Sequence, residues 1–164
     1  MLYYTGDVTG VTHLDNIFYV VCAGSSVIYL YYTDTFTPVD RVLIEVDGMH
    51  DPTDIVACLD DHQLYVADWN RGSPCIWRTS ADSGTSTKWL PTAAIDHVET
   101  LSVTSRRLLM TYPRGLRQFS TVDERLLRVV RLPDTMQLCH GVETARETFV
   151  VGYRTSLWHY GVSK

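Results

Sequence analysis

The sequence has no run of basic residues: its 14 Lys and Arg are scattered among 19 Asp and Glu, and the formal net charge is −5. A protein that binds a nucleic-acid phosphate backbone has Lys and Arg clustered on one surface, so we expect no nucleic-acid binding. No stretch approaches the roughly 18 consecutive apolar residues of a membrane-spanning helix, and we expect no membrane partner. The N-terminus lacks the basic and apolar regions of a signal peptide, which favours the cytoplasm if Met1 is genuine.

Cysteine is also scarce. Cys22, Cys58, Cys75 and Cys139 include no CxxC pair and lack the density of a disulfide-bonded scaffold, so we interpret them as reduced residues in or near the core. Cys58 and Cys75 are predicted on the first and third strands of one sheet, roughly 9.5 Å apart, which is too far for a disulfide. No nucleophile elbow, glycine-rich phosphate loop or helix-length amphipathic segment occurs, which argues against nucleophilic catalysis and an α/β enzyme core.

A repeated strand pattern is what the sequence does contain. Short β-forming segments with similar composition begin at four positions that are separated by 46, 44 and 41 residues, namely Phe18, Leu64, Leu108 and Phe149. A spacing of roughly 40 to 50 residues is the blade period of a β-propeller. These segments are the second strands of the repeats, and each is followed, after a loop short enough for a β-hairpin, by a third strand. The spacing therefore predicts an all-β propeller built from four-stranded antiparallel blades.

One complete cycle of the pattern lies between residues 51 and 84 and continues to Pro91. It predicts strands over 54–59, 64–68, 75–79 and 88–90, with the first strand the most buried and the last the most polar. The segment 125–131 has the best helical pattern of the chain. Its Val129 and Val130, followed by Pro133, favour a strand instead.

We predict a single domain over residues 1–164, with blades at about 8–48, 52–92, 97–134 and 140–164 and an N-terminal strand over 2–5. This amounts to three and a half to four blades. Either the N-terminal strand closes a four-bladed ring, or the chain is part of a larger, six-bladed ring. We favour the larger ring, because four blades are at the small limit of the architecture.

The best-preserved blade resembles NHL and related six-bladed propeller repeats of the TolB-like type. The matching positions are an entry segment, a second strand and a third strand: Pro52 with Ile55 to Ala57, Leu64 to Asp68, and Ile76 with Arg78. The other blades match by period alone. The resemblance implies a six-bladed ring and a structural role for Asp68. It also implies two functions found in such families, namely RNA binding and a lyase activity with zinc held by channel histidines.

The candidate site lies in loops that should emerge on one face of the propeller. Three histidines fall in equivalent connections between consecutive blades: His50, His97 and His140. Converging imidazoles could bind zinc with an open position. The loops between second and third strands carry Asn70, Arg71, Arg114 and Arg154, and arginine suits the recognition of carboxylates and phosphates.

Our leading functional hypothesis is a non-catalytic binding or scaffold propeller that presents this polar rim to a protein or a small ligand. The alternative is a metal-dependent hydrolase or lyase that uses the channel-mouth histidines. We expect no cofactor. Zinc at the three histidines, or calcium at Asp47, Asp51 and Asp54, are the metal alternatives; the three aspartates lack a compact calcium loop and favour turn formation and capping.

Overall fold

The computed structural model describes residues 6–69, 74–90, 98–132, 140–143, 148–153 and 156–161. Within these ranges every regular element is a β-strand, so the all-β prediction is confirmed. The same ranges contain no helix that is long and apolar enough to cross a membrane.

The strands form four antiparallel sheets, in each of which the strands follow one another in sequence order. Sheet A contains β1 (Val8–Leu14), β2 (Ile17–Cys22), β3 (Val27–Tyr32) and β4 (Pro38–Glu45). Sheet B contains β5 (Pro52–Cys58), β6 (Gln63–Asp68), β7 (Cys75–Ser80) and β8 (Ser86–Leu90). Sheet C contains β9 (Thr100–Thr104), β10 (Arg107–Tyr112), β11 (Gly115–Ser120) and β12 (Leu126–Arg131). Sheet D contains β13 (His140–Glu143), β14 (Thr148–Tyr153) and β15 (Ser156–Gly161).

The strand predicted over the helical candidate segment is confirmed as β12, since β-branched residues lose side-chain freedom in a helix. The prediction that the first strand is the most buried is wrong. In sheet B the second strand, β6, is buried at five of its six positions, whereas β5 is buried only at Pro52, Ile55 and Cys58. A second strand has neighbouring strands on both sides and neighbouring sheets on both faces, while a first strand turns one edge toward the centre of the molecule.

The turns repeat together with the strands. In sheets A, B and C, both the turn between the first and second strands and the turn between the third and fourth strands contain a residue with positive φ. Tight turns between antiparallel strands need this backbone conformation. Sheets A to C are thus repeats of one unit. The positive-φ residues of the two turns are Asp15 and Phe36 in sheet A, His62 and Gly84 in sheet B, and Arg106 and Glu124 in sheet C.

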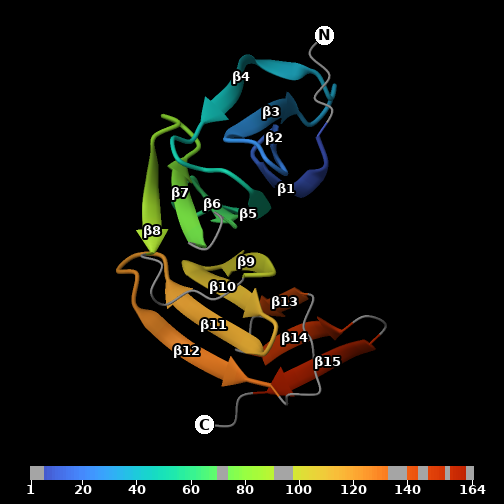
Figure 1. Ribbon diagram of the computed structural model, residues 1–164, viewed down its shortest axis with the longest axis vertical. Helices are drawn as coiled ribbons and strands as arrows, with labels where there is room; N and C mark the ends of the chain where they lie inside the picture. The colour runs from blue at the N-terminus through green and yellow to red at the C-terminus, as the bar shows by residue number, and fades with distance from the viewer. Residues whose placement is uncertain are drawn as a thin grey trace.

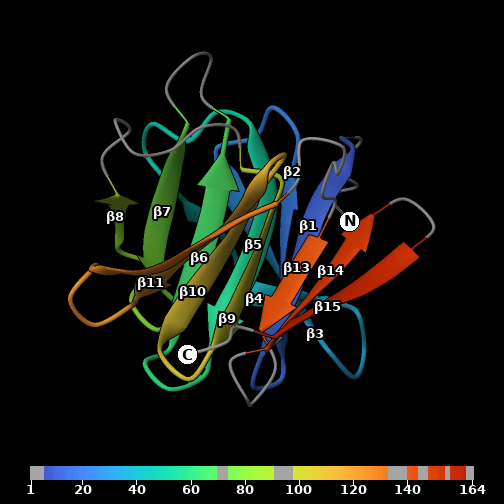
Figure 2. The ribbon, with the colours of Figure 1, turned by 90° about the horizontal axis from the view of Figure 1, so that it is seen from below.

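The sheets fan around a common centre (Figure 1), with β1, β5, β9 and β13 innermost and β4, β8 and β12 on the outside. Consecutive inner strands pack against each other, β1 on β5, β5 on β9 and β9 on β13. Gly10 permits the first of these contacts, because a Cβ atom there would lie 2.8 Å from the backbone nitrogen of Ile55. The same view turned by 90° (Figure 2) shows the strands running between two ends of the molecule, where the connections gather.

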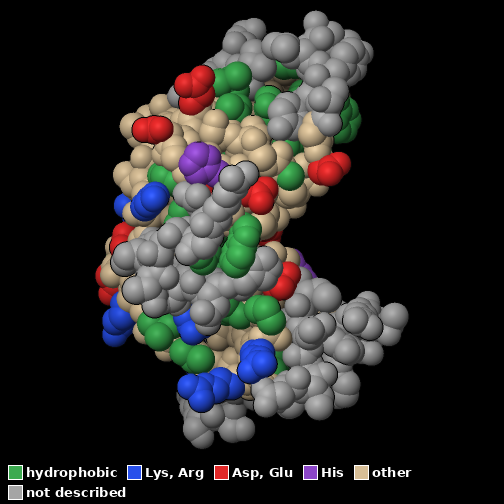
Figure 3. Space-filling view, in the orientation of Figure 1, with side chains coloured by type: hydrophobic (Ala, Val, Ile, Leu, Met, Phe, Trp, Pro, Cys, Tyr) green, Lys and Arg blue, Asp and Glu red, His purple; other side chains and the backbone are tan. Residues whose placement is uncertain are grey.

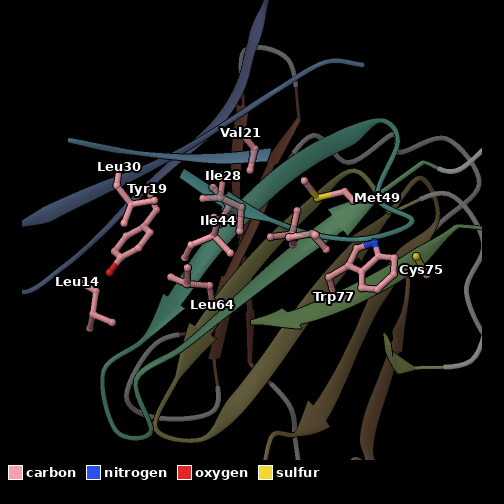
Figure 4. Close-up of a cluster of buried hydrophobic side chains, with 13 residues drawn as sticks. Leu14, Tyr19, Val21, Ile28, Leu30, Ile44, Met49, Leu64, Cys75 and Trp77 are labelled. Carbon is pink, nitrogen blue, oxygen red and sulfur yellow. The ribbon is translucent and has the colours of Figure 1, made fainter. Parts of the chain in front are cut away.

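Apolar side chains fill the space between neighbouring sheets. Sheets A and B enclose Leu14, Ile28, Ile44, Leu64 and Trp77 among other buried residues (Figure 4). Each fully buried aliphatic side chain of this kind contributes about 1.5–3 kcal/mol relative to an exposed one. The alternation of buried and exposed positions along the strands is therefore the main source of stability.

Aromatic rings connect sheets B and C. The Trp89 ring packs edge-on against Tyr65 and Phe119, with centroid separations of 5.2 and 6.1 Å. Leu116 and Phe149 belong to the smaller cluster between sheets C and D. In this way each sheet is fixed to the next, and the described residues form an arc of four sheets with an outline open on one side (Figure 3). Closure of this arc into a ring is not part of the described structure.

Candidate functional site

Asp68, at the end of β6, holds two connections together. Its buried carboxylate accepts hydrogen bonds from the backbone N–H groups of His50 and Asp51, at 3.2 and 2.7 Å, and from Nε1 of Trp77 at 3.0 Å. The β4–β5 connection is thereby tied to the end of β6, next to the β6–β7 connection. The two kinds of loop meet at one end of sheet B, as the blade pattern predicts.

Sheet C has different residues at the same places. Tyr112 lies opposite Gly115 just as Asp68 lies opposite Cys75, so Arg117 takes the position of Trp77. The guanidinium carbon of Arg117 lies 4.8 Å from the centroid of the Tyr112 ring, a cation–π arrangement. Where sheet B has an acid bonded to an indole, sheet C has a phenol stacked on a cation.

A pocket of about 520 Å³ opens at this end of sheet C. Gly115 lies between Tyr112 and Arg131 in the cross-strand row, so no side chain fills the gap between those two. The glycine is required, because a Cβ atom there would lie 2.3 Å from the carbonyl oxygen of Val130. Among the described residues that line the pocket are three arginines and no acid. The lining residues are Tyr112, Arg114, Gly115, Leu116, Arg117, Leu126, Val129, Val130, Arg131 and Leu132.

The charge around this pocket differs from that of the whole chain. Residues 98–132 contain seven Arg and three Asp or Glu, whereas residues 6–49 contain one Arg and six Asp or Glu. Lys and Arg side chains accordingly gather over the lower part of Figure 3, where β11 and β12 lie in Figure 1. The interpretation of the basic residues as scattered is therefore wrong for sheet C, which concentrates half of them in one repeat.

Three of the predicted site residues lie in the described part of the chain. His50 is exposed in the β4–β5 connection, Arg114 is exposed and lines the pocket, and His140 is exposed at the start of β13. The other four predicted residues, Asn70, Arg71, His97 and Arg154, lie outside the described residues. The structure thus places Arg114 in a pocket, His50 in the connection between sheets A and B, and His140 at the start of a strand of sheet D.

Metal binding has no support in the described residues, where no three His, Cys, Asp or Glu side chains are close enough to share an ion. Two of the calcium candidates accept backbone hydrogen bonds instead. Asp51 accepts one from Gly24 at 3.2 Å, and Asp54 accepts one from Ile55 at 2.8 Å and one from Leu101 at 2.7 Å. These bonds agree with the capping interpretation.

Asp54 connects the inner strands of sheets B and C. Burial raises its pKa above the ordinary value of 3.8, while the N–H groups of Leu101 and Ile55 and the nearby His140 act in the opposite direction. Glu143 makes a comparable connection between sheets D and C, since it accepts hydrogen bonds from Arg107 at 3.1 Å and from Gln118 at 2.5 Å. Both carboxylates hold neighbouring sheets in place.

Sequence reasoning missed Tyr112, Arg117 and Arg131 as candidate site residues. A signal for them was present, because a count of charges in each predicted blade separates residues 98–132 from the rest. The equivalence of Arg117 and Trp77 comes only from the register of the ladders. What no count reveals is that Arg114, Arg117 and Arg131 surround one pocket.

Neither the protein-family models nor the curated proteins contain a match to this chain, so the resemblance to NHL repeats has no family-level support. Solved structures do match. The computationally designed Ika4 protein aligns with a TM-score of 0.72 at 11% identity, over 98% of this chain and 94% of its own.

Two natural proteins share the fold at similar distance. The extracellular domain of BT4673 from B. thetaiotaomicron aligns with a TM-score of 0.66 at 14% identity, over 96% of this chain. PorZ, a surface component of the type-IX secretion system of Porphyromonas gingivalis, aligns with a TM-score of 0.67 at 12% identity, also over 96%. The chain spans 21% of the length of each. The chain therefore shares the β-sheet architecture of extracellular and surface β-rich proteins, and at these identities the likeness concerns the fold alone.

Proposed function

We propose that this chain is a non-catalytic binding module that holds an anionic group of a partner in the arginine-lined pocket of sheet C. The observation that carries the proposal is the convergence of Arg114, Arg117 and Arg131 on one pocket whose described lining has no acid. A guanidinium group presents a fork of N–H donors that matches the two oxygens of a carboxylate. Guanidinium and phenol groups bind and orient, and neither is a ready nucleophile at neutral pH.

The apolar part of the pocket favours a protein partner over a bare ion. Leu126 and Val129 line it and are 47% and 48% exposed. A partner that offers carboxylates beside apolar side chains would bury these two residues and neutralise the arginines. Rigid strands carry all the lining residues except Arg114 and Leu132, so the site is preorganised.

The finer architecture belongs to the same proposal: sheets A to D are blades of a β-propeller of the NHL-like, six-bladed type. The repeated strand order, the repeated positive-φ turns and the inner-strand packing support it. A binding site at the end of a blade is where propellers of many kinds hold their partners.

A matched pair of arginine variants tests the binding proposal. Arg131 lines the pocket, whereas Arg125 precedes β12, is exposed and lies 3.7 Å from Asp123. The probe is a fluorescein-labelled peptide of alternating Val and Glu, followed by anisotropy at low and moderate salt. We expect Arg131→Gln to weaken binding about tenfold and Arg125→Gln by less than about twofold. Equal effects of the two substitutions would show non-specific charge attraction and contradict the proposed site.

A further inference from the structure

β12 is the outer strand of sheet C, and part of its backbone faces outward. The backbone N–H of Leu132 donates to the carbonyl of Arg114 at 3.1 Å, which marks a hydrogen-bonded pair next to the pair of Arg131 and Gly115. Hydrogen-bonded and non-hydrogen-bonded pairs alternate along an antiparallel ladder. The N–H and C=O groups of Arg131 and Val129 therefore point away from β11, toward an edge on which no described strand pairs.

The side chains of this edge are unusually apolar for an exposed strand. Leu126, Leu127 and Val129 are 47%, 38% and 48% exposed. The outer strands of the neighbouring sheets differ, because β4 begins with Pro38 and β8 buries its large residue, Trp89. Proteins usually protect such an edge with charges, prolines or short strands, since it can pair with another chain.

Charge indicates which chain the edge accepts. Arg128 and Arg131 belong to β12, and Arg125 precedes it. Pairing of β12 with the β12 of a second copy would bring arginines together across the new ladder, which is unfavourable. An extended segment that carries Asp or Glu has the complementary charge.

We propose that β12 binds an extended acidic segment of a partner protein, which adds to sheet C as a fifth strand. Its backbone pairs with the outward groups of Val129 and Arg131. Its alternate side chains lie over the same face as those two residues, with a carboxylate beside Arg131 and an apolar side chain beside Val129. In this mode main-chain hydrogen bonds supply affinity and alternate side chains supply specificity. The inference rests on the proposed binding function and adds the form in which the partner binds.

A proline substitution tests the backbone pairing. Val129→Pro removes one outward N–H and no hydrogen bond to β11, and proline is tolerated on an edge strand in this orientation. Val129→Thr is the matched control, because it keeps the N–H and the β-branched shape. With the labelled Val–Glu peptide of about eight residues, we expect Val129→Pro to weaken binding roughly tenfold more than Val129→Thr does, because both substitutions alter the side chain and only proline removes the N–H.

The second measurement leaves the protein unchanged. A peptide with one N-methylated amide at its centre keeps every side chain but loses a donor, and we expect it to bind the original protein roughly tenfold more weakly. This result decides the question even if Val129→Pro proves unfolded by circular dichroism.

The outcomes separate the two proposals. If Arg131→Gln weakens binding while Val129→Pro and N-methylation do not, strand addition is wrong and the arginine pocket stands. If none of the three changes weakens binding, both proposals are wrong. Tighter binding of a single-stranded RNA oligonucleotide than of the peptide would overturn the choice of a protein partner.

Discussion

Sheets B and C have the same strand order, and their second and third strands pair in the same register, yet three equivalent positions carry different kinds of residue. In sheet B the end of the second strand is acidic, the middle position of the third strand is aromatic, and the fourth strand adds a cation. These residues are Asp68, Trp77 and Lys88, and Nζ of Lys88 lies 5.3 Å from the Trp77 ring. In sheet C the corresponding residues are Tyr112, Arg117 and Val129.

The difference shows how equivalent positions of two repeats take different roles. The carboxylate of Asp68 accepts hydrogen bonds from the backbone of the β4–β5 connection and from Trp77, so it anchors that connection to sheet B. The Arg117 guanidinium lies over the Tyr112 ring and lines a pocket. The same strand order thus supports a structural anchor in one sheet and a cation beside a pocket in the next.

The largest effect should come from removing the anchor of sheet B. Asp68→Ala would leave four donors without their acceptor: two backbone N–H groups of the β4–β5 connection, the indole of Trp77 and the thiol of Cys75. We expect the free energy of unfolding to fall by about 3 kcal/mol. Urea unfolding followed by tryptophan fluorescence measures it.

The equivalent change in sheet C should cost much less. Tyr112→Phe keeps the ring beneath Arg117 and removes the hydroxyl that donates to the sulfur of Met110 at 3.4 Å. We expect a loss of about 0.5 kcal/mol, because a thioether is a weak acceptor. Equal losses of unfolding free energy for the two substitutions would contradict the different roles assigned to Asp68 and Tyr112.

Transferring the sheet B pair into sheet C should weaken binding strongly with the fold retained. The double variant Tyr112→Asp with Arg117→Trp places an acid and an indole where the pocket has a phenol and a cation. We expect the affinity for the Val–Glu peptide to fall about tenfold or more, from lost attraction and added repulsion. Anisotropy titration checks it, with far-ultraviolet circular dichroism as the control for folding. Unchanged affinity would show that Arg117 is not part of the site.

The contact between sheets B and C should make stability depend on pH through Asp54. Its pKa is raised by burial, so the folded protein binds this proton more tightly than the unfolded chain does. Stability from this group is therefore present at low pH and falls as the pH rises from 3.8 through the higher folded value.

Asp54→Asn should remove this dependence. The asparagine amide cannot ionise, so the variant should gain stability relative to the original protein as the pH rises across that window. Urea midpoints measured at several pH values check the slope, and Asp51→Asn is the control. Parallel curves for the original protein and Asp54→Asn would contradict the assignment.

The last prediction concerns thiols, which occur in sheet B but not in residues 98–132. Burial raises the pKa of Cys58 and Cys75 to about 11, and Cys22 is buried with a raised pKa as well. In a Cys139→Ser background we expect native labelling by a disulfide reagent to be roughly a hundredfold slower than labelling in urea. Fast native labelling would show that sheets A and B open more readily than their packing indicates.

Much of the fold could be predicted from the sequence, and much of the site could not. The segments around Leu64, Ile76 and Leu108 alternate strongly and are bounded by turn residues, so their strands were predicted within a residue or two. The pocket depends on residues that lie opposite one another across three strands, such as Tyr112, Gly115 and Arg131. Such neighbours can be identified only when the pairing register of each two strands is known. Histidines at similar points of the repeat suggested a shared site, but His50 lies in the β4–β5 connection, whereas His140 begins β13 of sheet D.

The sequence by itself determined the strands, their period and the all-β class, because alternation of apolar residues and turn chemistry act over a few neighbouring residues. Only the tertiary structure decided which charges meet. Arg114, Arg117 and Arg131 come from a turn and two strands, and they surround one pocket because the antiparallel register aligns them and Gly115 leaves the space between them. The pocket is therefore encoded in cross-strand rows, which no local pattern reveals.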